Sequence, residues 1–111
     1  MRSYMIQDIR PRDMDTFTAH LKETGYKSPM DGIFWIPLPE SLQGKAQQEH
    51  NSQCGPYYLA LEVGQDWLRL ELLVRSEQRL RCDCIMYADP GQREAMIEFL
   101  DDLIKNRDIA V

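Results

Sequence analysis

The chain has 111 residues, a formal net charge of −5, 43% hydrophobic residues and 28% charged residues. This composition is typical of one globular domain spanning 1–111, and the negative charge disfavours sequence-independent binding to nucleic acid. No apolar run approaches the roughly 20 residues that cross a bilayer, so no membrane partner is expected.

The N-terminus and the cysteines together predict the cellular compartment. The segment MRSYMIQDIR lacks the apolar core, about 7–15 residues long, of a secretory signal. The three cysteines are an odd number and show no disulfide framework. We therefore expect a cytoplasmic protein.

A helix is predicted near the start of the chain, over about 11–24. Pro11 suits the first turn of a helix, and Gly25 suits a position just after its end. Three apolar side chains recur between them at helical spacing: Met14, Phe17 and Leu21. Residues 4–9 before this helix fit either a short strand or an approach to it, because their apolar pattern is too brief.

The next segments are a strand and a polar stretch. IFWIPL at 33–38 has strand character, and Pro37 places it at a sheet edge or ends it early, because proline cannot donate to a ladder. Residues 40–50 are polar and compatible with a short helix. Residues 51–56, which end in Gly55-Pro56, are expected to be a loop.

Residues 57–87 carry the strongest pattern in the chain, with apolar and polar residues alternating at a period of two. This predicts three antiparallel strands at 57–63, 67–75 and 79–87. A turn at Gln65-Asp66 would pair Leu61 with Leu70 on the inner face and Glu62 with Arg69 on the outer face. The inward residues are then Leu59, Leu61, Val63, Leu68, Leu70, Leu72, Val74, Leu80, Cys82, Cys84 and Met86.

A second helix is predicted over about 90–106. Asp89, Pro90 and Gln92 form an N-terminal capping sequence, and an apolar stripe follows them. These elements predict an α+β fold, a two-layer sandwich. Both main helices cover one face of an antiparallel meander sheet that has three central strands and one or two edge strands.

Cys82 and Cys84 admit two interpretations. On a strand they share the inner face with Leu80, so the first interpretation makes them packed core thiols without metal. In the alternative, they join His50 and Cys54 as four soft ligands of a tetrahedral zinc site. His50 and Cys54 could also pair as base and nucleophile. The sequence shows no oxyanion hole or orienting third group, so we expect no enzyme.

The outer face of the sheet is the other candidate site. Its expected large side chains are Tyr58, Trp67, Leu73, Ile85 and Tyr87. Aromatic and apolar residues among alternating charges are typical of a protein interface, although a solvated sheet face also carries aromatic cross-strand pairs. We therefore expect a small module, without catalytic machinery, that binds a protein or a ligand. It is expected to self-associate as a homodimer through this face, and a zinc- or thiol-dependent protein is the alternative.

Overall fold

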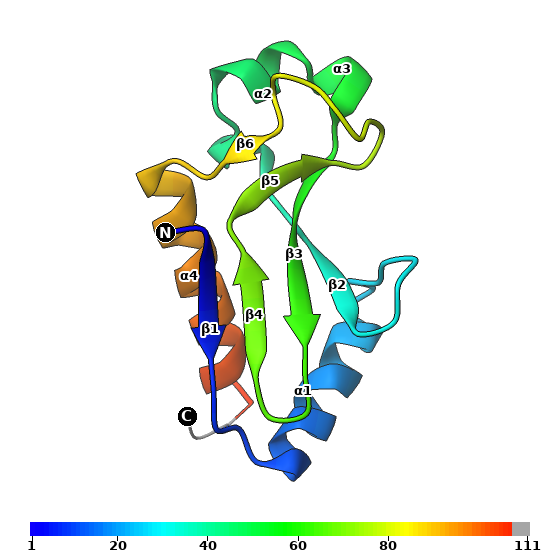
Figure 1. The fold of residues 1–111 in the computed structure, drawn as a ribbon, viewed down its shortest axis with the longest axis vertical. Coiled ribbons are helices and arrows are strands. Elements are labelled where there is room, and N and C mark those ends of the chain that lie inside the picture. The colour runs from blue at the N-terminus through cyan, green and yellow to red at the C-terminus, as the bar shows by residue number, and fades with distance from the viewer. Residues whose placement is uncertain (108–111) are drawn as a thin grey trace.

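A computed structural model describes residues 1–107 and has an α+β fold with an antiparallel sheet (Figure 1). Within these residues the sheet has six strands, accompanied by four α-helices and one short 3-10 turn. In chain order the elements are β1 (Ser3–Ile6), α1 (Pro11–Glu23), β2 (Ile33–Pro37), η1 (Glu40–Leu42), α2 (Lys45–Glu49), α3 (Asn51–Cys54), β3 (Tyr57–Val63), β4 (Leu68–Glu71), β5 (Leu73–Ser76), β6 (Met86–Tyr87) and α4 (Pro90–Lys105).

The sheet has the order β1-β4-β3-β5-β6, and β2 also pairs with β3. The predicted first hairpin is confirmed, because Leu61 pairs with Leu70 and Glu62 pairs with Arg69. On the outer face, Nη2 of Arg69 donates to Oε1 of Glu62 at 2.6 Å. The predicted strand 67–75 is interrupted at Leu72, but β4 and β5 both remain paired to β3.

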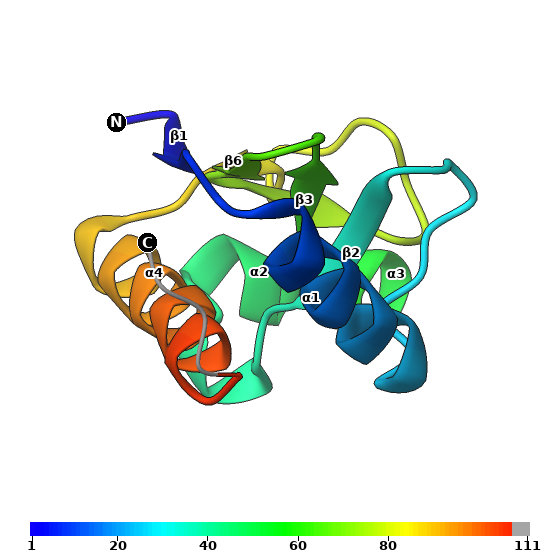
Figure 2. The same ribbon diagram turned by 90° about the horizontal axis from the view of Figure 1, so that it is seen from below.

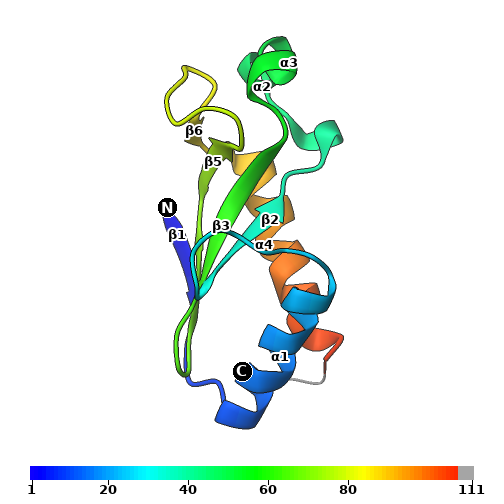
Figure 3. The same cartoon turned by 90° about the vertical axis from the view of Figure 1, so that its right-hand side faces the viewer.

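Helices α1 and α4 lie on one face of the sheet, as Figures 2 and 3 show. The apolar residues of β3 and β4 that point to these helices are buried, as the period of two predicts. Each helix adds its own buried stripe, so the core lies between the two layers. The stripes are Met14, Phe17 and Leu21 on α1, and Met96, Leu100 and Ile104 on α4.

Both helices begin where their sequences predict. The Asp89 carboxylate accepts a hydrogen bond from the backbone N–H of Gln92, and the Gln92 side chain accepts one from the backbone N–H of Asp89. Pro11 and Pro90 occupy first-turn positions, where the missing N–H has no cost. Gly25 follows the end of α1 with φ of 82°, a left-handed conformation that glycine adopts without strain.

The predicted third strand at 79–87 is wrong, because only Met86–Tyr87 pairs in the sheet and 77–85 form a loop. Ser76 supplies the physical reason. Its hydroxyl accepts hydrogen bonds from the backbone N–H groups of Gln78 and Arg79, which turn the chain out of the ladder. Leu80, predicted to be inward, is therefore 95% exposed.

Three smaller differences separate the prediction from the structure. Met86 is exposed rather than inward, and Ile85 packs partly against the core rather than facing outward. Residues 51–54, predicted as loop, form the short helix α3. Four residues are too few to show helical periodicity, so the sequence carried no signal for this helix.

Candidate metal centre

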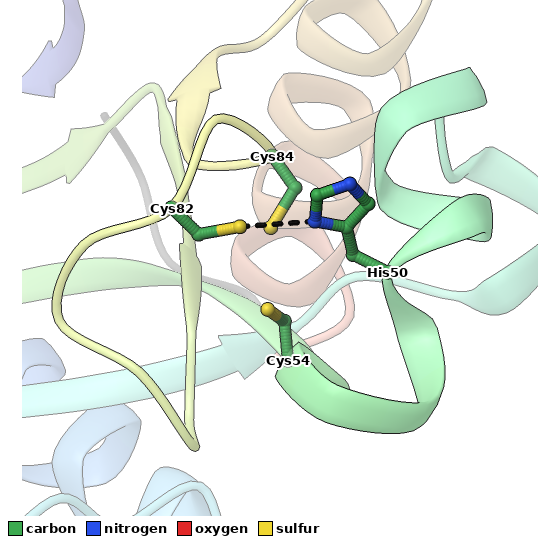
Figure 4. A group of neighbouring side chains, drawn as sticks. All are labelled: His50, Cys54, Cys82 and Cys84. Carbon is green, nitrogen blue, oxygen red and sulfur yellow. Dashed lines mark hydrogen bonds between the residues drawn. The ribbon is translucent and has the colours of Figure 1, made fainter.

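His50, Cys54, Cys82 and Cys84 converge at one end of the sheet, as the sticks in Figure 4 show. Their ligand atoms, one from each residue, all lie within 4.8 Å of one another. Two of the residues come from the α2–α3 segment and two from the loop that leads to β6. The four residues are called the His-Cys cluster below.

Local backbone geometry places each pair of side chains. The backbone N–H of Cys54 donates to the carbonyl of His50 at 2.8 Å, so one helical turn puts both side chains on the same face of α3. In the loop, the backbone N–H of Ile85 donates to the carbonyl of Cys82 at 3.0 Å. This turn directs the thiols of Cys82 and Cys84 toward the imidazole (Figure 4).

A polar contact within the cluster joins Nδ1 of His50 to Sγ of Cys82 at 3.0 Å. The pKa of Cys82 is lowered from 9.0 to about 6, first by the backbone N–H of Cys84 and then by the Cys84 thiol. Burial, with a smaller contribution from the neighbouring thiols, raises the pKa of Cys54 to about 11. The cluster therefore favours a thiolate at Cys82 in particular.

Burial within the cluster is uneven. Cys54 is 1% exposed and Cys84 is 0% exposed, whereas His50 and Cys82 are only partly buried. The site is thus closed toward the core and accessible from one side. A metal ion can enter from that side without opening the sheet, which is a requirement for a credible metal site.

A buried hydrogen-bond network supports the cluster from behind. The amide nitrogen of Gln47 donates to the carbonyl of Cys84 at 3.2 Å, and the amide nitrogen of Gln92 donates to Oε1 of Gln47 at 2.9 Å. The hydroxyl of Tyr57 donates to the carbonyl of Gln47 at 2.9 Å. These bonds tie α2, the Cys84 backbone and α4 together. Supports of this kind commonly orient metal ligands.

A second set of contacts fixes the Cys54 side of the cluster. The Ser76 hydroxyl donates to the carbonyl of Cys54, and the Gln78 side chain donates to the carbonyl of Gly55. Sequence patterns gave no signal for Gln47 or Ser76, because single polar residues in short segments have no periodicity. Gln92 was identified as a helix-capping residue but not as part of this network.

The structure brings together all four residues of the zinc alternative. Cys84 is fully buried, as a packed thiol would be, but Cys82 is partly exposed and lies in a loop. Packing behind an alternating strand therefore does not account for the arrangement. The nearest partner of His50 is Cys82 rather than Cys54, so the suggested pairing of His50 with Cys54 as base and nucleophile lacks its expected contact.

The five residues predicted for the outer face lie in different surroundings, and two of them, Tyr58 and Tyr87, line one groove. Tyr58 is buried under Trp35, with ring centroids 4.1 Å apart, and Leu73 pairs with Tyr87. Trp67 covers Gly64 at the β3–β4 turn, where an added Cβ would clash with the indole. Ile85 precedes β6 at the opposite end of the sheet (Figure 1). Self-association through this face stays a prediction.

Comparison with protein-family models, with curated proteins and with solved structures found no match for this chain. Among the helices within residues 1–107, none is both long enough and apolar enough to pass through a membrane.

Proposed function

We propose that the protein binds one zinc ion through the imidazole of His50 and the thiolates of Cys54, Cys82 and Cys84. The observation that carries this proposal is the convergence of four soft ligand atoms within 4.8 Å. Tetrahedral zinc with Zn–S bonds of about 2.3 Å requires sulfur atoms roughly 3.8 Å apart. Side-chain adjustments of about 1 Å would therefore complete the coordination.

The chemistry of the cluster supports zinc over a set of packed thiols. Zinc binds thiolates rather than thiols, and the lowered pKa of Cys82 favours the thiolate. Three thiolates and one Zn²⁺ carry a net charge of −1, which the backbone N–H of Cys84 helps to stabilise. The imidazole nitrogen of His50 already lies 3.0 Å from the sulfur atom of Cys82, so these two ligand atoms are adjacent.

The ligand set further indicates a structural rather than a catalytic ion. Four protein ligands fill a tetrahedral coordination shell and leave no position for water or substrate. The ion would join the α2–α3 segment to the loop 77–85, which otherwise share only a few hydrogen bonds. We infer a zinc-stabilised binding module without catalytic machinery.

Metal analysis of purified protein tests this proposal directly. Native mass spectrometry under reducing conditions is expected to show one zinc per chain, and Cys84→Ser and His50→Ala are expected to lose most of it. The matched control is His20→Ala, which removes the other histidine of the chain, on α1 and outside the cluster. Protein that stays free of metal after incubation with zinc would refute the proposal, as would equal loss in the His20 variant.

A further inference from the structure

Cys82 is the cysteine of the His-Cys cluster that solvent reaches. It is partly exposed and stands in the loop before β6 between two exposed residues, Arg81 and Asp83. Cys54 and Cys84 lie behind it against the core, since they are 1% and 0% exposed. Because the oxidation of a cysteine depends on access to its sulfur atom, a small oxidant from solvent meets Cys82 first.

Cys54 supplies a second thiol within reach of Cys82. Its sulfur atom faces those of the loop (Figure 4), and the ligand atoms of the two residues lie within 4.8 Å of each other. A disulfide has a sulfur–sulfur distance of about 2.05 Å, so the two atoms need to approach by no more than about 2.8 Å. Because the residues on either side of Cys82 are exposed, the loop can make this shift without disturbing the packed core.

Cys84 is less suited to bridge with Cys82. One residue separates the two in the sequence, so a disulfide between them would close a small ring and strain the bond geometry. The carbonyl of Cys84 also accepts a hydrogen bond from the amide nitrogen of Gln47 at 3.2 Å, which holds it in place. Cys54 and Cys82 belong to segments far apart in the chain, so a bridge between them joins α3 to the loop 77–85 without such a ring.

We propose that the His-Cys cluster is a redox-sensitive zinc site, in which a peroxide joins Cys54 to Cys82 and thereby releases the ion. The inference rests on the proposed function, because the ion released is the zinc that the four residues hold. A zinc-bound sulfur is a thiolate, which is the form that peroxides oxidise. The site thus holds two oxidisable sulfur atoms side by side until an oxidant arrives.

The reaction takes two steps when hydrogen peroxide is the oxidant. The Cys82 sulfur attacks one peroxide oxygen, so that an S–O bond forms, the O–O bond breaks, and the departing hydroxide takes a proton from solvent. The Cys54 thiolate then attacks the Cys82 sulfur, so that the S–S bond forms and the S–O bond breaks. A second hydroxide leaves and is protonated. The two sulfur atoms lose two electrons, and the peroxide accepts them and becomes two water molecules.

The disulfide removes half of the ligand set. Zinc binds thiolates, so the bridged sulfur atoms no longer coordinate it, and only His50 and Cys84 remain. The ion is therefore released, while the new bond keeps the loop 77–85 attached to α3. A dithiol such as dithiothreitol reduces the bridge by thiol–disulfide exchange and restores the site. The cap is thus cross-linked by metal in the reduced state and by a disulfide in the oxidised state.

The test treats the full zinc-loaded chain, freed of reductant, with a small excess of hydrogen peroxide. The absorbance of pyridylazoresorcinol reports released zinc, and mass mapping without reduction identifies the disulfide. Loss of the bound zinc is expected together with a Cys54–Cys82 bridge, while Cys84 stays open to alkylation after denaturation. Dithiothreitol followed by zinc should reverse both changes. Cys82→His keeps a zinc ligand but removes the exposed thiol, so it should retain most of its zinc over the same time.

The matched control is Met86→Leu, which removes an exposed oxidisable sulfur close to the cluster and should leave zinc release unchanged. Zinc retained by the peroxide-treated wild type would overturn the inference, as would a bridge that joins Cys82 to Cys84 or to a second chain. Equal release from a zinc-loaded Cys82→His protein would do the same. If the reduced chain binds zinc but peroxide does not form the Cys54–Cys82 bridge, this inference alone fails. If that bridge forms in a chain that never binds zinc, the zinc proposal fails and only the thiol pairing stands.

Discussion

Two regions of this molecule are held together by different forces. The sheet–helix core, formed by β1 to β4 with α1 and α4, buries contiguous apolar side chains. The cap, formed by α2, α3 and the loop 77–85, lies at one end of the long axis (Figure 1). The only buried residues of α2 and α3 are Gln47 and Cys54. The cap therefore depends on hydrogen bonds and, by our proposal, on zinc, because so little apolar surface is available there.

The largest effect is expected from removing the metal. Structural zinc sites contribute about 10–16 kcal/mol in small zinc-finger peptides, so its loss should release the whole cap. Hydrogen exchange should show amides of 77–85 and α3 losing protection after chelation, while those of β3 and β4 keep theirs. Uniform loss of protection across core and cap would contradict the division into two regions. The His20→Ala protein should respond to chelation like the wild type.

A substitution in the sheet–helix core should lower the unfolding free energy through the core rather than through the cap. Leu70→Ala removes a side chain buried between the sheet and the helices, and it is expected to cost about 2–5 kcal/mol of unfolding free energy. Leu80→Ala makes the same chemical change at an exposed position, so its effect should stay within about 0.5 kcal/mol. Urea denaturation measures both. Similar losses in the two variants would mean that the loop 77–85 packs as a strand after all.

The thiols of the metal-free cap should differ in reactivity. Because the pKa of Cys82 is lowered to about 6, it is a thiolate at neutral pH, and alkylation should slow only as the pH falls through about 6. Cys54, with its pKa raised to about 11 and its side chain buried, should react far more slowly. Mass mapping of iodoacetamide adducts tests this order. Zinc should protect both residues, and preferential labelling of Cys54 would contradict the described geometry.

Gln47 links the two regions, so its replacement should have an intermediate effect. Gln47→Ala leaves buried partners unsatisfied, at an expected cost of about 1–3 kcal/mol. Loss of its support for Cys84 should also weaken zinc binding about 10–100-fold. Gln48→Ala, at the exposed neighbouring position, is the control for both measurements. Unchanged zinc affinity in the Gln47 variant would show that the network stabilises α2 without orienting the ligand.

The smallest effect on stability is expected from breaking an ion pair on the outer face of the core. The Arg69–Glu62 pair is half exposed on both sides, so a double-mutant cycle should give a coupling energy of only about 0.2–1 kcal/mol. The coupling should fall further in high salt, because solvent-exposed charges are screened. A coupling well above this range would mean that the pair is more shielded than its exposure indicates.

The sequence by itself determined most of the core. Helices α1 and α4 and the β3–β4 hairpin follow from periodicity and capping within each segment, so local pattern was sufficient. It also supplied the four candidate ligands, but as the alternative to packed thiols. Which interpretation fits the fold depended on contacts between segments far apart in the chain.

The arrangement of the cap became evident only from the tertiary structure. The alternation at residues 80, 82, 84 and 86 resembles a strand, yet backbone hydrogen bonds that the Ser76 hydroxyl accepts turn this segment away from the sheet. Its cysteines then meet His50 and Cys54, which a helical turn has placed on one face of α3. Side-chain hydrogen bonds and ligand convergence are not periodic, so no pattern in the sequence encodes them. They arise only when the folded core brings the two segments together.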